Sequence, residues 1–492
     1  MTKFLEIVNR AVWGIPTLVL ILGLGLYLSI KTGFAQLSLL PKAFSCFFSR
    51  FRKQERDVDG VSPFQALCTA LAATVGTGNL AGVAGAIALG GPGSIFWMWV
   101  CAIFGMITKF AEATLAVRYR VRDAEGSFTG GPMYMIRNGL GKRFSWLSVL
   151  YCFFGVVAAF GVGNATQINA VVGSVNMAVA ALGGEPSTVG NAVIGCALSV
   201  LVATMLLGGA KRIGMAAERL VPLASVVYLL LGAGVLISNA DAVPAAFAMI
   251  LHGAFSPKAV TGGVLGSCFV SLRVGVSRGV FTNEAGMGTA SIAHASASVS
   301  HPVQQGLLGI MEVFLDTIVI CTMTALVILC SGIPVRYGVD EGVILTIRAF
   351  SSVYGQWISL PIAAAMCAFA FATVLGWGLY GMRCAQYLFG DTVWKKFVFL
   401  QGGIVVLGAV LQTGTVWLLS EIVNGLMALP NLIALAYLSP ELIRLTKEYK
   451  FSLADKKTAD GGTYEYFDQC KPLRTVTYAE IPPAGRSGEE QR

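Results

Sequence analysis

The sequence Thr74-Val-Gly-Thr-Gly-Asn79 interrupts a long apolar stretch that we expect to form a helix over residues 62–89. Two glycines, two threonines and one asparagine break the helical pattern near the middle of this stretch. If the helix crosses a bilayer, its unwound backbone groups must be satisfied by a ligand or by buried protein. The segment is therefore a candidate binding site, and close packing of small residues between helices is the alternative.

The composition of the chain places this helix in a membrane. Of its 492 residues, 55% are hydrophobic and 12% are charged, and the mean hydropathy is +0.71. A soluble surface cannot hide so much apolar area. Because a spanning helix needs about 20 apolar residues, we predict an all-α polytopic membrane protein with about eleven transmembrane helices. We expect them at residues 11–30, 62–89, 93–118, 145–182, 188–208, 214–238, 260–295, 303–331, 357–388, 396–413 and 415–438.

Positive charges alternate between the loops. The loop 31–60 carries six Lys and Arg residues and the segment 118–143 carries six more, whereas 89–93 and 183–188 carry none. Loops rich in Lys and Arg stay in the cytoplasm, which predicts an external N-terminus and a cytoplasmic C-terminus. Because these charges are spread over short loops, we expect no nucleic-acid partner. The cysteines lie mostly in apolar runs without CxxC spacing, so we assign them no disulfide or metal.

The odd helix count leaves two groups of five helices after the first, and these groups start in opposite directions. Transporters with inverted repeats have this arrangement, and the first helix of each half is broken near the bilayer centre. In the seventh helix, breaks are expected at Arg273-Val-Gly-Val-Ser-Arg-Gly279 and Asn283-Glu-Ala-Gly-Met-Gly288. We expect an extra helix at 1–30, a basic cytoplasmic loop at 31–61, five-helix repeats at 62–238 and 260–438, an interfacial connector or lid at 339–353, and a polar cytoplasmic tail at 450–492.

The ends of the two half-helices at the first break have opposite polarity. Amides near Thr77 and Gly78, which start the outer half, favour a carboxylate. Carbonyls at the end of the inner half suit a hard cation, and Asn79 adds an amide oxygen nearby. The glycines at 76 and 78 allow φ values that are closed to other residues.

Polar side chains at membrane depth are further candidates. We expect Arg278 to form a structural clamp with Glu284, and direct contact with the substrate is the alternative. Gln167 and Asn164 share a helix face by i, i+3 spacing, and either amide lines a pocket or joins helices. Three acids could be proton relays, or could pair with Lys109, Arg118 or backbone amides: Glu112, Glu312 and Asp316.

Other classes of membrane protein lack support in the sequence. A channel should show a pore-lining motif, and a hydrolase should show HExxH or a GxSxG elbow. The sequence has no HExxH, and Gly275-Val-Ser-Arg-Gly279 matches GxSxG only inside an expected membrane helix. We therefore expect a secondary carrier and no enzyme. Neutral oxygens at the breaks favour sodium, and a proton-coupled carrier of another small amino acid or related solute is the alternative.

Four stretches resemble the alanine or glycine:cation symporter family of prokaryotes. They are Gly90-Gly-Pro-Gly-Ser-Ile-Phe-Trp-Met-Trp99, Gly76-Thr-Gly-Asn79, Arg278-Gly-Val-Phe-Thr-Asn-Glu-Ala-Gly286 and Thr373-Val-Leu-Gly-Trp377. The resemblance extends over residues 10–450. It implies a LeuT-like fold with an extra N-terminal helix, location in the cytoplasmic membrane, and uptake of alanine, glycine or a similar small neutral amino acid with co-transported sodium.

The same resemblance implies roles for individual residues. One sodium ion would be held by the carbonyls of Ala72 and Val75 with the Thr373 hydroxyl, and a second would lie near Thr74 and Asn79. Gly275 and Ser277 would face the substrate amino group, and Gln167 and Trp377 would close the pocket. The full set of expected substrate contacts is Thr77, Gly78, Asn79, Gln167, Gly275, Ser277 and Trp377.

Overall fold

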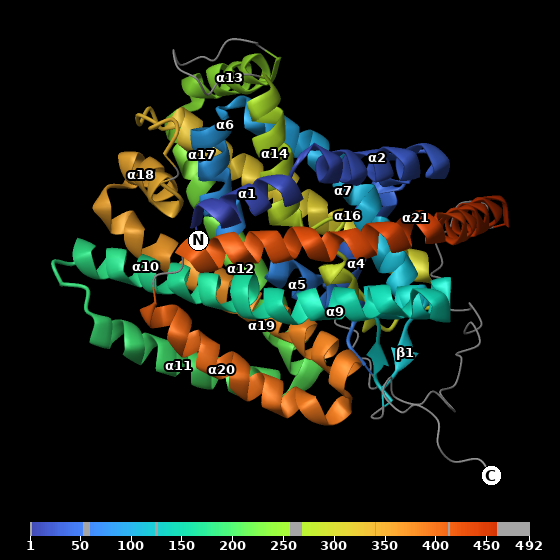
Figure 1. Cartoon of the computed structure of the whole chain (residues 1–492). Coiled ribbons are helices and arrows are strands. Elements are labelled where there is room, and N and C mark those ends of the chain that lie inside the picture. The colour runs from blue at the N-terminus through green and yellow to red at the C-terminus, as the bar shows by residue number, and fades with distance from the viewer. Residues whose placement is uncertain are drawn as a thin grey trace.

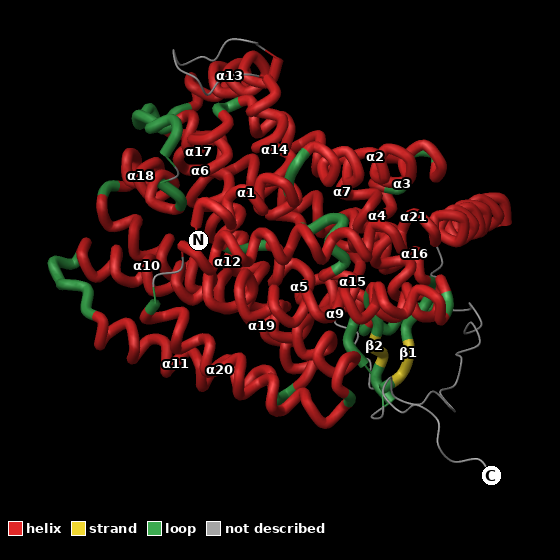
Figure 2. The backbone as a smooth tube through the Cα atoms, viewed as in Figure 1, coloured by secondary structure: helices red, strands yellow, loops and turns green. Residues whose placement is uncertain are grey.

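The structure is a computed structural model that describes residues 2–52, 60–123, 126–255, 268–339, 341–411 and 414–459. Helices make up most of the described chain (Figure 2). One short antiparallel hairpin pairs β1 (Val121–Arg122) with β2 (Phe128–Thr129), and Val121 lies opposite Thr129. The all-α fold class predicted from composition is confirmed.

Each of the eleven expected spans is occupied by helix. In chain order, these helices are α2 (Ile15–Thr32), α5 (Pro63–Thr74) with η1 (Gly78–Gly82) and α6 (Val83–Gly90), α7 (Gly93–Arg118), α9 (Ser145–Phe160) with η4 (Gly161–Ala165) and α10 (Thr166–Ala181), α11 (Thr188–Leu206), α12 (Gly209–Ser238), α14 (Cys268–Asn283) with α15 (Thr289–Ala295), α16 (Pro302–Val313) with η6 (Phe314–Cys321) and α17 (Thr322–Cys330), α19 (Ser359–Phe389), α20 (Trp394–Val410) and α21 (Gly414–Ala459). The shorter helices are α1 (Thr2–Val12), α3 (Ala35–Ser38), α4 (Leu40–Arg52), α8 (Pro132–Met135), η2 (Ile136–Leu140), η3 (Lys142–Phe144), η5 (Ala240–Ala242), α13 (Val243–Phe255), α18 (Val343–Tyr354), η7 (Gln356–Ile358) and η8 (Asp391–Val393).

Length and apolarity support ten of these spans. Among the described residues, nine helices could each cross a membrane, and α5 with α6 forms a tenth span as a pair bent by 50°. The remaining expected span, 260–295, is occupied by the shorter helices α14 and α15, and its residues 260–267 lie outside the described part.

Several boundaries differ from those expected. The region 1–30 contains two helices, because the chain turns at Gly14 and restarts at Ile15 with a proline in the first turn of α2. The loop 31–61 contains α4, and α21 continues past residue 450 to Ala459. Residues 460–492 of the expected tail lie outside the described part. The helical connector expected at 339–353 is present as α18, and the division into two repeats stays a prediction.

The connections lie at two opposite ends of the molecule. The N-terminus, α18 and the turn between α10 and α11 lie toward the left in Figure 1, whereas the β1–β2 hairpin and the end of α21 lie toward the right. The segment 183–188, which carries no Lys or Arg, is thus at the opposite end from the basic segment 118–143. This placement agrees with the alternation of loop charges.

Helix α7 is enclosed by the rest of the bundle. In the apolar stretch of α7, 83% is buried inside the protein, whereas only 17% of the corresponding stretch of α11 is buried. It packs against α14, α15 and α16, whereas α11 and α20 lie along one edge of the molecule (Figure 1). Polar side chains on α7 therefore face protein rather than lipid.

The second interruption is shorter than expected. The predicted break at 273–279 is wrong, because α14 is a continuous helix through this range to Asn283. The chain leaves helical structure only over residues 284–288, where Glu284 has a left-handed φ of 53°. The expected clamp between Arg278 and Glu284 is also wrong. Arg278 instead forms an ion pair with Glu421 of α21, with a nitrogen–oxygen distance of 3.6 Å.

The opposite placement of the two loops predicts a labelling pattern. In a variant without native cysteines, Glu185→Cys should react with an impermeant maleimide in intact cells, because the α10–α11 turn is expected outside. Arg122→Cys in the basic hairpin should react only after the membrane is permeabilised. The reverse pattern would contradict the orientation, and equal labelling of both positions in intact cells would contradict their placement on opposite sides.

Candidate functional site

The first break lies where α5 ends inside the molecule. Val75 leaves the helix with extended backbone (φ −77°, ψ 101°), and the path bends by 50° into η1 and α6. Asn79 holds the turn, because its Oδ1 accepts a hydrogen bond from the Gly76 amide at 2.9 Å. The break predicted at residues 74–79 is confirmed.

A hydroxyl from α19 reaches the carbonyl end of α5. Thr373 Oγ1 lies 2.8 Å from the carbonyl oxygen of Ala72 and 2.9 Å from that of Phe369 on its own helix. Since α5 stops at Thr74, its last carbonyls have no following helical turn to donate to them. Oxygen atoms from two distant segments therefore meet at one end of the break.

The two glycines of the break have different surroundings. A Cβ atom at Gly76 would lie 2.7 Å from Thr373 Oγ1 and 3.5 Å from Gln167 Oε1. A Cβ atom at Gly78 would lie 3.3 Å from Cγ2 of Thr282, a contact that a small shift relieves. Neither glycine has a positive φ. The expected need for unusual backbone angles is thus wrong, and Gly76 matters because neighbouring side chains approach it closely.

The amides of Gln167 and Asn164, whose roles the sequence left open, point to different places. Gln167 Oε1 accepts a hydrogen bond from Thr77 Oγ1 at 3.3 Å, and its Nε2 donates to the Val162 carbonyl at 3.2 Å. Asn164 Nδ2 instead donates to the Gln401 carbonyl of α20 at 2.9 Å. Gln167 therefore lies beside the break, whereas Asn164 joins two helices.

A buried carboxylate lies on the other side of Asn79. Asn79 Nδ2 donates to Asp316 Oδ1 at 2.6 Å, and Thr317 Oγ1 donates to Asp316 Oδ2 at 2.8 Å. Asp316 is fully buried, so a cation at this place would offset its charge. Thr74, expected here too, has its hydroxyl turned to the Ala70 carbonyl of its own helix at 3.2 Å.

The two expected contacts on α14 lie apart from the break. Gly275 packs against α7, since a Cβ atom there would lie 2.3 Å from the Ser94 carbonyl oxygen and 2.7 Å from Trp97 Cβ. Ser277 lies in the same continuous part of α14. The residues of α14 that approach Gly78 are Thr282 and Phe281, near the helix end.

Trp377 is held by the second break. Its indole nitrogen donates to Glu284 Oε1 at 3.0 Å, and Thr289 Oγ1 bonds to Glu284 Oε2 at 2.5 Å. Trp377 is 1% exposed and lies against Gly163 of η4. Because Trp377 follows Thr373 by one helical turn, α19 contacts both breaks.

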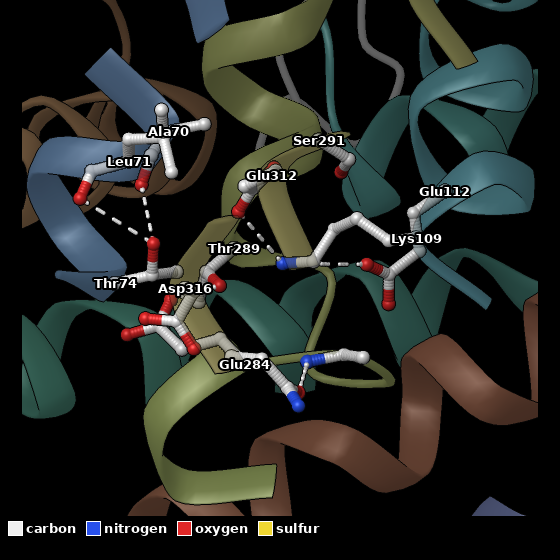
Figure 3. A network of polar contacts seen from close by, with 12 residues as sticks. Ala70, Leu71, Thr74, Lys109, Glu112, Glu284, Thr289, Ser291, Glu312 and Asp316 are labelled. Atoms are coloured by element: carbon white, nitrogen blue, oxygen red, sulfur yellow. Dashed lines mark hydrogen bonds and ion pairs between the residues drawn. The ribbon is translucent and has the colours of Figure 1, made fainter. Parts of the chain in front are cut away.

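A group of buried charges surrounds the second break (Figure 3). Lys109 of α7 lies between two carboxylates, with Nζ 3.2 Å from Glu312 Oε1 and 4.0 Å from Glu112 Oε2. Glu112 Oε1 accepts the backbone amides of Gly286 and Gly288 at 2.9 and 3.0 Å. These contacts match the alternative of paired acids rather than free relays.

The sequence signals for this group were partial. The i, i+3 spacing of Lys109 and Glu112 indicated a pair, but nothing in the local sequence joined them to residues 286–288. His294 was not singled out, although its Nε2 lies 2.8 Å from Glu312 Oε2 and it is fully buried. A histidine in an apolar, interrupted helix is the signal that could have identified it.

The fold defines a class of protein. A solved structure of MhsT in complex with L-phenylalanine is similar, with a TM-score of 0.55 and 14% identity, and the match covers 79% of this chain and 98% of that chain. The bent α5–α6 pair and the helical architecture thus form a LeuT-like fold. The chain belongs to the sodium:alanine symporter family, whose model matches residues 1–461.

The names of two relatives state a function. The sodium/alanine symporter AgcS of Methanococcus maripaludis is 42% identical over 449 residues, which cover 90% of this chain and 96% of that protein. A probable sodium/glutamine symporter, GlnT of Bacillus subtilis, is 38% identical over 449 residues, which cover 90% of this chain and 89% of that protein. The protein is therefore a sodium-coupled amino-acid symporter rather than an enzyme, and sodium is its co-transported ion.

The different surroundings of the two glycines predict different effects on transport. Gly76→Ala should weaken sodium-dependent uptake strongly, because its methyl group would displace Thr373 Oγ1 or Gln167. Overpacking of this kind costs about 1–3 kcal/mol, which corresponds to roughly a 5- to 150-fold loss of affinity. Gly78→Ala should be milder. Initial uptake rates against sodium concentration, at matched surface expression, test this order, and a larger defect for Gly78→Ala would contradict it.

Proposed function

We propose that this symporter takes up alanine or glycine with sodium by alternating access, binding both at the α5–α6 break. The observation that carries the proposal is the meeting of the Thr373 hydroxyl with the Ala72 carbonyl, 2.8 Å apart, at the end of a broken helix. Unwound carbonyls and half-helix ends are the usual cation and substrate ligands in transporters of this kind.

The substrate carboxylate is proposed to bind the first amides of the outer half, at Thr77, Gly78 and Asn79. Thr77 stands at the N-cap position of η1, but its side chain makes no capping bond. Its hydroxyl bonds Gln167 instead. Uncapped amides at a helix start favour an anion, and this supports a carboxylate at the break.

Sodium is proposed to bind at two positions. The first uses the carbonyls of Ala72 and Val75 with Thr373 Oγ1, and the extended backbone of Val75 supports its part because the residue has left the helix. The second lies near Asn79, where the buried carboxylate of Asp316 supplies negative charge. The bond of Thr74 to its own helix removes support for its hydroxyl as a ligand.

The enclosure of the proposed site supports a small substrate. Thr77, Gln167, Thr373 and Trp377 are each at most 4% exposed, so the described arrangement is closed and large side chains have little room. We propose that Gln167 and Trp377 limit the pocket. The packing of Gly275 against α7 removes the support for direct substrate contacts from Gly275, and Ser277 lies in the same uninterrupted helix.

We place the protein in the prokaryotic cytoplasmic membrane, with its N-terminus outside and its C-terminus in the cytoplasm. The opposite placement of the basic hairpin and the α10–α11 turn, which has no Lys or Arg, supports this orientation. The proton-coupled alternative is not favoured, because the family couples to sodium and the first break is lined by neutral oxygens.

The sodium position predicts a matched pair of variants at Thr373. Thr373→Val keeps the shape but removes the hydroxyl, and should raise the sodium concentration for half-maximal uptake by roughly tenfold or more. Thr373→Ser keeps the hydroxyl and should change the sodium concentration for half-maximal uptake much less. Uptake in proteoliposomes with imposed sodium or proton gradients measures both. If uptake by the two variants depends equally on sodium, Thr373 is not part of the sodium site.

The proposed pocket limit predicts a change of specificity at Trp377. Trp377→Ala should lower alanine uptake and admit larger neutral residues, since each methylene in a fitted apolar pocket is worth about 1–3 kcal/mol. Trp377→Phe removes the indole N–H but keeps most of the bulk, so this variant should not admit the larger neutral amino acids. Competition against labelled alanine by a panel of L- and D-amino acids measures this. If both variants admit larger substrates, bulk at Trp377 does not set the limit.

A further inference from the structure

The carboxylates around the second break outnumber the basic groups that face them. Four acids are at most 3% exposed, and in the described part of the chain Lys109 is the only Lys or Arg ion-paired with any of them. The four are Glu112, Glu284, Glu312 and Asp316. An isolated buried carboxylate is so costly that it takes up a proton or binds a cation.

His294 does not supply the missing charge. Gln305 Nε2 lies 2.7 Å from His294 Nδ1 and 3.4 Å from the carbonyl oxygen of Pro63. Because the amide nitrogen is the group that can donate to that carbonyl, His294 Nδ1 acts as an acceptor. Nε2 then carries the ring hydrogen and donates to Glu312 Oε2, and the imidazole is neutral.

Two of the four acids have contacts that stabilise the ionised form. Glu312 contacts Lys109 at 3.2 Å and accepts from His294. Glu112 accepts two backbone amides at the start of α15 and the Asn431 amide at 2.7 Å. Hydrogen bonds to backbone amides at a helix start favour a carboxylate anion.

The other two acids form no ion pair within 4.0 Å among the described residues. Asp316 lies at the proposed second sodium position, and we exclude it as a proton site for that reason. This is the only step at which the inference rests on the proposed function. Glu284 is different, because both of its bonds go to neutral side chains, Trp377 and Thr289. Lys109 and Glu312 act on it electrostatically from α7 and α16, and it acts on the phenols of Tyr151 and Tyr380.

The backbone supplies a second, independent observation. Glu284 has a φ of 53°, a left-handed conformation that costs a residue with a side chain about 1–2 kcal/mol. Glycines occupy such positions at Gly286 and Gly288 in the same turn. A buried acid kept in a strained conformation between two half-helices is characteristic of a functional group.

We propose that Glu284 is a proton-binding site of this symporter, separate from the sodium positions, and that its carboxyl is protonated in the closed arrangement described. The proton comes from water and returns to it. In this form Glu284 Oε2 donates its hydrogen to Thr289 Oγ1, and Oε1 accepts from Trp377. Sodium remains the driving ion, and the bound proton makes uptake depend on pH.

The protonation state can be measured without transport. Infrared difference spectra of the full protein in lipid, recorded during a pH titration, should contain the C=O stretching band of a protonated carboxylic acid. Glu284→Gln should lose this band. Glu112→Gln is the matched control, because Glu112 is assigned as ionised and its loss should leave the band in place. Persistence of the band in Glu284→Gln, its absence from the unmodified protein, or its loss in Glu112→Gln would each overturn the proposal.

A second variant covers the case in which Glu284→Gln does not fold. Trp377→Phe removes a donor that favours the ionised carboxylate, so the band should titrate at a pH higher by about one unit. Uptake by this variant should follow pH with the same upward shift. An unshifted band would show that the titrating acid is not the one bonded to Trp377. The infrared spectra are recorded with saturating sodium and without substrate, so that sodium rather than a proton neutralises Asp316. Failure of the proposed amino-acid function would therefore leave this test unaffected.

Discussion

The structure depends on one constraint, which is that backbone groups exposed by a broken helix inside a membrane must find partners. At the first break, Asn79 accepts the Gly76 amide and Thr373 reaches the Ala72 carbonyl. At the second, the carboxylate of Glu112 accepts two amides. Asn79 lies within the first break itself, whereas Thr373 and Glu112 come from α19 and α7. The need to satisfy the breaks therefore brings α7 and α19 to the centre.

The same partners create an electrostatic requirement. A carboxylate that caps buried amides needs nearby positive charge, and Lys109 is buried on the same helix as Glu112 and bonded across to α16. Glu284 and Asp316 extend the negative region toward Trp377 and Asn79. The proposed binding of sodium and of a proton would each reduce this excess, because a dry interior does not tolerate unbalanced charge. In that proposal, the residues that couple uptake to ions also hold the helices together.

Local patterns in the sequence predicted the features that depend on local chemistry. Apolar runs located all the spans, and the small polar cluster at residues 74–79 located the first break. The second break was predicted too broadly, because Arg273 and Arg278 looked like interruptions although α14 tolerates both. The partners of Arg278 and Glu112 come from segments far along the chain. Such contacts depend on tertiary packing, which spacing along one helix does not reveal.

The half-helices α15 and η1 differ in how the backbone amides at their starts are satisfied. This difference has a consequence for the energy efficiency of transport. The start of α15 carries its own anion in Glu112, whereas the start of η1 has no side-chain cap. If a substrate carboxylate binds the backbone amides at the start of η1, an empty carrier that closes must bury these amides without a hydrogen-bond partner. This costs about 1–3 kcal/mol for each amide. Closure without cargo would then be rare. The missing cap would act as a safeguard against futile cycling, in which sodium crosses alone and dissipates its gradient.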